Sequence, residues 1–104
     1  MSQFSELPLK PELVKNLETL GFDSMTEIQA QSLPKILAGK DVLAKAKTGS
    51  GKTVAFALGL LNRLDVERFR IQALVMCPTR ELAEQVAEEI RRVGRMIDNM
   101  KVLT

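Results

Sequence analysis

The chain has 104 residues, about the size of one small domain, and its 45% hydrophobic and 27% charged residues are typical of a globular protein and not of a disordered one. The net charge of +2 is too close to neutral for the overall field to indicate a nucleic-acid-binding protein, so any basic site must be local. One cysteine and no histidine exclude an intrachain disulfide and offer no zinc or iron–sulfur site.

The first residues and the apolar runs bear on the location of the protein. The start, Met1 to Glu6, lacks the basic residues and the apolar core of a signal peptide. No apolar run approaches the roughly 18 residues that would span a bilayer. We therefore expect a cytoplasmic protein without a membrane-spanning segment.

The first predicted helix begins near Pro11, a residue that suits the first turn of a helix. Leu13, Leu17 and Leu20 then recur at helical spacing. Gly21 follows and is typical of a helix end, so the sequence predicts a helix from Pro11 to Gly21.

A second helix is predicted from Thr26 to Gly39. Thr26 and Gln29 form the T-x-x-Q pattern of a capping box, in which each side chain binds the other residue's backbone N–H. Pro34 lies inside this helix, and we expect a kink there because proline removes a backbone hydrogen bond.

Strands and helices then alternate. Residues 42–44 predict a short strand, and a glycine-rich turn leads into a helix that begins at Lys52. Residues 71–77 predict a second strand, a further helix begins at Thr79, and residues 101–104 begin a third strand. This order predicts an α/β fold, with a parallel sheet, flanking helices and right-handed crossovers.

The two later helices have apolar positions at helical spacing, which are Ala57, Leu60, Leu61 and Leu64 in the first and Leu82, Val86, Ile90 and Val93 in the second. Near the end of the second, Arg91, Arg92 and Arg95 favour a solvated face where positive charge complements the helix dipole. Two or three strands do not complete a parallel sheet, so we expect an exposed sheet edge and exposed apolar surface, as in part of a larger domain.

The turn between the first predicted strand and the helix that begins at Lys52 matches the phosphate-binding pattern G-x-x-x-x-G-K-[ST], except that alanine replaces the first glycine. Its residues are Ala46, Lys47, Thr48, Gly49, Ser50, Gly51, Lys52 and Thr53. Gly49 and Gly51 allow backbone angles that turn N–H groups toward phosphate oxygens, at the positive end of the following helix. Lys52 would reach the β- and γ-phosphates, and the Thr53 hydroxyl would complete the coordination of Mg²⁺.

The alternative for this segment is an ordinary glycine-rich turn. Because glycine makes up about 7% of residues, a chance G-x-G-K-[ST] in a chain of this length has a probability on the order of a few in a thousand. Its place between a predicted strand and a predicted helix favours the phosphate-binding interpretation.

Three segments together resemble the DEAD-box RNA helicase family. The alanine-first loop, residues 46–53, is one of them. Gly21-Phe22 followed by residues 25–29 is similar to the family's adenine-recognition motif, with Phe4 as the isolated upstream aromatic. Residues 78–83 are identical to the family's first RNA-contacting motif. The resemblance covers essentially the whole chain, and the likeness is greatest to a bacterial type.

The resemblance implies an adenine site at Phe4, Thr26 and Gln29. Gln29 also has a chemical reason to read adenine, because its amide offers the donor and the acceptor that the N6/N7 edge requires. The alternatives are that Gln29 only completes the capping box and that Phe4 belongs to the core. Met25 and Glu27 depart from the family pattern, in which proline is usual at both positions.

The resemblance also implies that Pro78, Thr79, Arg80 and Glu81 contact the RNA backbone. They follow a predicted parallel strand and begin a helix, which is where open α/β sheets place ligands. Helix N–H groups, the Thr79 hydroxyl and the Arg80 guanidinium suit a phosphodiester and ignore base identity. The alternative is a helix cap with Arg80 in a salt bridge to a neighbouring acid.

As a whole, the resemblance implies an incomplete amino-terminal RecA-like domain, with an adenine-recognition region at 1–38 and the phosphate loop and first RNA motif at 39–104. It further implies that the protein uses ATP and Mg²⁺, with Lys52 and Thr53 as the catalytic residues present in this chain. It also implies an RNA partner, specifically ribosomal RNA in ribosome assembly, and a second RecA-like domain. The motifs that hold the catalytic glutamate and the arginine fingers are absent, so these residues alone are not expected to hydrolyse ATP. A phosphate-loop kinase without RNA and a non-catalytic ATP-binding module remain alternatives.

Overall fold

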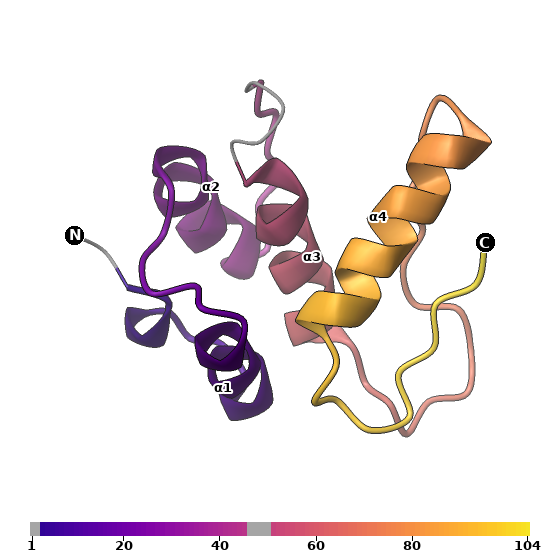
Figure 1. Cartoon of the computed structure of the whole chain (residues 1–104), viewed down its shortest axis with the longest axis horizontal. Coiled ribbons are helices and arrows are strands. Elements are labelled where there is room, and N and C mark those ends of the chain that lie inside the picture. Colours follow the sequence, from indigo (N-terminus) through magenta and orange to yellow (C-terminus); the bar gives the residue numbers. More distant parts are fainter. Residues whose placement is uncertain (1–2, 46–50) are drawn as a thin grey trace.

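The structure is a computed structural model, and it describes residues 3–45 and 51–104. In chain order the regular elements are a short 3-10 helix, η1 (Phe4–Glu6), and four α-helices: α1 (Pro11–Thr19), α2 (Glu27–Leu37), α3 (Lys52–Arg63) and α4 (Arg80–Val93). Figure 1 shows α2 beside α3, with α4 on the other side of α3 and α1 near the carboxyl ends of α3 and α4. None of the helices in these two ranges is long and apolar enough to cross a membrane.

The boundaries of α1 and α2 confirm the predicted starts and stops. Pro11 is the first residue of α1, and Gly21 follows that helix with φ of 83°, a value that favours glycine. Thr26 caps α2, with both halves of the capping box formed. Gly39 lies just beyond α2 with φ of 84°, and the helix continues through Pro34 to Leu37.

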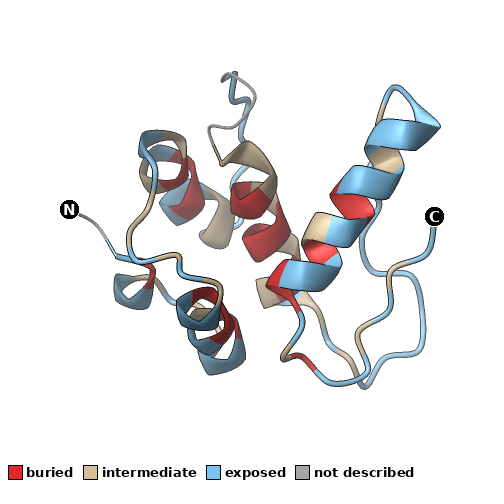
Figure 2. Ribbon diagram, in the orientation of Figure 1, coloured by how far each residue is buried: buried red, intermediate tan, exposed pale blue. Residues whose placement is uncertain are grey.

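The core lies between the helices and is built mainly from the apolar positions that the helical spacing picks out (Figure 2). The most buried of its large side chains are Leu13, Leu17, Leu33, Leu58, Leu61 and Val93. Gly59 lets α2 approach α3 closely, because a Cβ atom there would lie 2.3 Å from Ile36 Cγ2. The phosphate-loop helix therefore packs directly on the helix that carries Gln29.

The predicted strands do not form as paired strands within the described part of the chain. Residues 42–44, 71–77 and 101–104 have no regular secondary structure. Strand assignment requires ladder hydrogen bonds to a neighbouring strand, and none of these segments is paired with another described segment. The prediction of paired strands at these positions is wrong for this chain taken alone, because a strand depends on neighbours that its own sequence does not supply.

The apolar side chains of these segments remain exposed, as expected for an incomplete sheet. The exposed fractions are 91% for Leu43, 86% for Ile71, 81% for Leu74, 85% for Met76 and 88% for Leu103. A run this apolar in a monomeric domain is normally covered. The helices thus pack against one another, whereas the segments predicted as strands remain uncovered.

Candidate functional site

The start of α3 has the geometry that the phosphate-loop pattern predicts. Gly51 precedes the helix with φ of 90° and ψ of 15°, in the left-handed region. Lys52 and Thr53, the first two helical residues, are half-buried. Residues 46–50 of the loop, which are Ala46, Lys47, Thr48, Gly49 and Ser50, lie outside the described residues.

Gln29 connects the capping box of α2 to the start of α3. Its Oε1 accepts a hydrogen bond from Thr26 N at 2.9 Å, and its own backbone N donates to Thr26 Oγ1 at 3.4 Å. At the other end of the amide, Nε2 donates to the carbonyl oxygen of Gly51 at 3.1 Å. The side chain is only 5% exposed. The predicted capping box is therefore confirmed, and the same amide also reaches the residue before the phosphate-loop helix.

Side-chain atoms of Gln29 and Thr26 occupy the space that a side chain on residue 51 would need. A Cβ atom there would lie 2.4 Å from Gln29 Nε2 and 3.0 Å from Thr26 Oγ1. Only glycine combines this contact with a left-handed backbone at no steric cost. Glycine at position 51 is thus favoured by the contacts with α2 as well as by its own left-handed backbone angles.

A wide cavity brings these residues together. Its volume is about 1670 Å³, and its walls include Thr26, Gln29, Gly51, Lys52 and Thr53. It exceeds the roughly 300–1,000 Å³ of a small-molecule pocket because it also extends between the helices and parts of segments 39–44 and 72–78. Two of the three predicted adenine residues, Thr26 and Gln29, therefore line the same space as the first residues of the phosphate-loop helix.

Phe4 lies elsewhere. It is 4% exposed and belongs to the hydrophobic core. The described residues around the wide cavity do not include it; it lines a smaller cavity of about 310 Å³ with Val14, Leu17 and Phe22. The structure thus places Phe4 as the core alternative expects, and its contact with a base stays a prediction.

Residues 78–81 form an exposed helix start at the amino end of α4. The Thr79 hydroxyl accepts a hydrogen bond from Leu82 N at 3.1 Å and so caps the helix. Pro78, Arg80 and Glu81 are exposed. Within residues 3–45 and 51–104 the ion pairs are Arg68–Asp65, Arg91–Glu88 and Arg92–Glu89, so the salt bridge considered for Arg80 is not formed there.

Two contacts at the carboxyl end of α4 are not evident from the sequence. Asn16 is 1% exposed, and its Nδ2 donates to the carbonyl oxygens of Arg92 and Val93, each at 2.7 Å. The guanidinium carbon of Arg92 lies 5.5 Å from the centroid of the Phe22 ring. The one sequence signal is that Asn16 is a polar residue on the apolar face of α1. The predicted solvated face holds for Arg91, Arg92 and Arg95, which are exposed, although Arg92 covers an aromatic ring.

The described residues contain no cluster of three or more metal-ligating side chains. Mg²⁺ in nucleotide sites is commonly bound through one or two protein side chains together with substrate phosphates. Thr53 suits that part because it is half-buried at the helix start and faces the wide cavity.

Comparison with solved structures identifies the fold. Dbp5 of Saccharomyces cerevisiae, bound to RNA and ADP BeF3, superposes with a TM-score of 0.87 at 36% identity, over 92% of this chain and 25% of that one. A DEAD box protein from Methanococcus jannaschii gives 0.83 at 37% identity, over 89% of this chain and 26% of that one. The predicted α/β RecA-like class is confirmed, since the chain follows the course of such domains even where its strands are unpaired.

Comparison with known sequences agrees. The chain is 58% identical to ATP-dependent RNA helicase DbpA of Escherichia coli, over all of its own length and 23% of that protein, in line with the expected bacterial type. It is 46% identical to DEAD-box ATP-dependent RNA helicase CshA of Geobacillus kaustophilus, over 90% of this chain and 20% of that one. The chain thus spans about a quarter of the length of these relatives. Residues 26–104 match the DEAD/DEAH box helicase family, and the chain belongs to that family.

Proposed function

We propose that this chain is part of an ATP-dependent RNA helicase, in which it holds ATP and supplies part of the RNA-binding surface. The observation that carries the proposal is the hydrogen bond from Gln29 Nε2 to the carbonyl oxygen of Gly51. It joins the residue suited to reading adenine to Gly51, the residue directly before the phosphate-loop helix. The names of the relatives, ATP-dependent RNA helicases, and the RNA and ADP BeF3 in the Dbp5 structure agree with both ligands.

Lys52 and Thr53 are the residues that act on the phosphates. Lys52 places a positive charge against the β- and γ-phosphates, and Thr53 supplies a hydroxyl ligand to Mg²⁺ bound with the nucleotide. When bound there, Mg²⁺ would supply positive charge beside the phosphates. The reaction is transfer of the γ-phosphoryl group to water, for which positioning and charge neutralisation provide most of the catalysis.

Gln29 supplies the selectivity for adenine. The described hydrogen bonds use one acceptor site of Oε1 and one N–H of Nε2, whereas a primary amide offers two of each. A second acceptor site and a second N–H match the N6 donor and the N7 acceptor of adenine. Guanine presents O6 in place of the N6 donor and makes a poor partner.

The amino end of α4 forms the RNA-binding part. Backbone N–H groups at the helix start, together with the exposed Arg80 guanidinium, suit a phosphodiester. Thr79 already caps the helix, so its hydroxyl accepts one bond from the protein while its O–H can donate to a phosphate oxygen. Contacts of this kind fix the backbone of the RNA and leave its sequence unread.

The finer assignments extend the same proposal to the whole protein. They are a second RecA-like domain that closes on the ATP, ribosomal RNA as the substrate, a role in ribosome assembly and a cytoplasmic location. Their support is the family membership of the chain and the short share of its relatives that it covers. Hydrolysis itself depends on motifs that these 104 residues do not contain.

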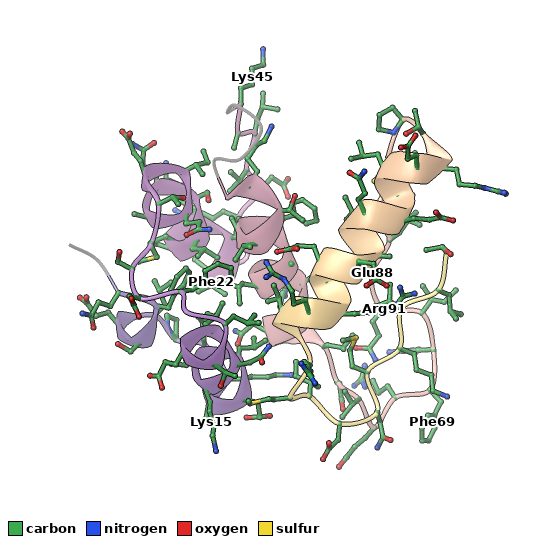
Figure 3. The ribbon with its side chains drawn as sticks, in the orientation of Figure 1. Lys15, Phe22, Lys45, Phe69, Glu88 and Arg91 are labelled. Atoms are coloured by element: carbon green, nitrogen blue, oxygen red, sulfur yellow. The ribbon has the colours of Figure 1, made fainter. Side chains whose placement is uncertain are left out.

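Replacement of Lys52 tests the ATP part of the proposal. In the full-length protein, Lys52→Ala should lower the rate of phosphate release from ATP by roughly 100-fold or more, because an uncompensated phosphate charge raises the barrier. Lys15→Ala is the matched control, since Lys15 is an exposed lysine on α1, far from the start of α3 (Figure 3). Near-normal turnover by Lys52→Ala would contradict the phosphate-loop assignment.

A further inference from the structure

The segment formed by residues 8–22 contacts the carboxyl ends of both helices whose amino ends carry the proposed sites. We call this segment the N-terminal brace. At the amino ends, α3 begins with Lys52 and α4 begins with Arg80. Figure 1 shows both helices converging on the region of α1. The brace thus lies at the far end of both helices from the chemistry.

Hydrogen bonds fix the brace to the end of α3. The side-chain oxygen of Asn62 accepts from Lys10 N at 2.7 Å, and Asn62 Nδ2 donates to the carbonyl oxygen of Pro8 at 3.3 Å. The Lys10 ammonium also donates to the carbonyl oxygen of Leu64, just beyond the helix. Side chains therefore satisfy backbone groups on both partners, which ties the brace to the last turn of α3.

A second set of contacts fixes the brace to the end of α4. The buried Asn16 amide donates to two carbonyl oxygens of the last turn, those of Arg92 and Val93. These are groups that a helix end leaves without partners in the helix itself. The Arg92 guanidinium lies over the Phe22 ring, four residues before Thr26. The brace therefore contacts the end of α4 only four residues before the capping box of α2 begins.

The ends of α3 and α4 also touch each other. A Cβ atom on Gly94 would lie 3.1 Å from both Cδ atoms of the fully buried Leu61. Packing this close transmits displacement, because a dense interior does not absorb it. An α4 helix of 14 residues is roughly 20 Å long. Displacement of its amino end by bound RNA would therefore rotate α4 about the end that the brace holds.

From these contacts we infer that the N-terminal brace couples RNA binding at Arg80 to the ATP site, with Asn16 and Arg92 as positioning residues. The inference rests on the proposed function. With the brace in place, RNA that shifts α4 changes the position of α3 and of the segment that enters α2. Without it, α4 yields at its free end and the shift is lost. Neither Asn16 nor Arg92 touches a phosphate or a base in this account.

The test measures coupling in the full-length protein. The affinity of a non-hydrolysable ATP analogue is determined with and without saturating single-stranded polyuridylate RNA, and the ratio of the two is the coupling factor. Asn16→Ala and Arg92→Gln should each lower this factor by roughly threefold or more. The affinity for the analogue without RNA, and for RNA without nucleotide, should stay within about twofold.

Matched variants separate coupling from general weakening. Arg92→Lys keeps a cation over Phe22 and should retain the coupling factor. Glu89→Gln removes the 2.6 Å ion pair to Arg92 but leaves the ring contact, and should retain it too. Arg91→Gln is the arginine control, because Arg91 contacts Glu88 and Val102 and not the brace. Loss of coupling in these three variants would overturn the assignment.

Further outcomes complete the test. If Asn16→Ala and Arg92→Gln lower the melting temperature and leave the coupling factor unchanged, the brace is a structural cap and the inference is wrong. If Asn16→Ala does not fold, Arg92→Gln decides alone, because Arg92 is exposed and its replacement leaves no buried gap. If the parent protein binds ATP and RNA without coupling, the inference is wrong. If it binds neither ligand, the proposed function fails, an outcome distinct from a coupled parent whose variants are unchanged.

Discussion

Gln29 is held by protein groups at both ends of its side-chain amide, and this decides how its roles can be separated. The oxygen serves the capping box through Thr26 N, and the nitrogen serves Gly51 and, in the proposed function, adenine. Glutamate keeps the oxygen and loses the nitrogen. A carboxylate at this position also suits the positive amino end of α2.

Gln29→Glu and Gln29→Ala should therefore weaken ATP binding while only the alanine variant loses the cap. Two hydrogen bonds to adenine are worth roughly 1–3 kcal/mol between them, and GTP should lose much less affinity than ATP. Thermal melting and nucleotide titrations on the full-length protein measure both effects. Equal losses for ATP and GTP in both variants would return Gln29 to capping alone.

Gly51 combines a positive φ with a crowded Cβ position, whereas Gly21 has a positive φ and open space. Gly21→Ala should cost the backbone penalty of about 1–2 kcal/mol in free energy of unfolding. Gly51→Ala should cost more than that, and should also weaken ATP, because the new methyl group displaces Gln29 Nε2. Urea unfolding of both variants gives the comparison, and equal costs would show that Gln29 moves aside freely.

At the scale of the elements, the helices were predictable because their signals are local. Pro11, the Thr26–Gln29 box and the Thr79 cap are read from residues within one turn of each other, and the structure has all three. The prediction of paired strands at 42–44, 71–77 and 101–104 was wrong for this chain, because pairing depends on distant neighbours. The Asn16 contact to Arg92 spans 76 residues, so no local pattern announces it.

The candidate site, too, is only partly predictable from the sequence. The link between Gln29 and Gly51 joins two predicted motifs, but the sequence does not show that they touch across 22 residues. Phe4 had two open interpretations, and burial places it in the core. Motifs and apolar faces with a fixed local spacing could be read from the sequence, whereas contacts between distant segments, such as Gln29 with Gly51, could not.

Arg80 carries the prediction that belongs to α4. Arg80→Ala should weaken RNA binding to a similar degree across unrelated sequences and lower the salt dependence of binding by about one phosphate contact. The affinity for ATP without RNA should change little, because Arg80 begins a different helix from Lys52. Filter binding at two salt concentrations measures this, with Arg95→Ala as an exposed control on the far end of the helix region.

An unchanged RNA affinity in Arg80→Ala would mean that the exposed arginine only solvates the helix start. An equal loss of ATP affinity without RNA would mean that it supports the fold. A melting curve separates that second outcome from simple unfolding.

At the scale of the whole molecule, the helices are packed while the apolar segments at Leu43, Leu74 and Met76 face solvent. The chain covers about a quarter of its relatives, whose further residues would have to cover such a surface for the sheet to form. The proposed activity therefore belongs to the full-length protein. In the proposed function, these 104 residues contribute nucleotide binding at the start of α3 and RNA contact at the start of α4.

If ATP and RNA act together on one protein, phosphate release from ATP by the full-length protein should depend on RNA. We expect slow release with ATP alone, release that rises at least severalfold when RNA of any sequence is added, and little release from GTP under either condition. RNA-independent release at the full rate, or transfer of the phosphoryl group to a small acceptor, would contradict this expectation and indicate a phosphate-loop enzyme without an RNA function.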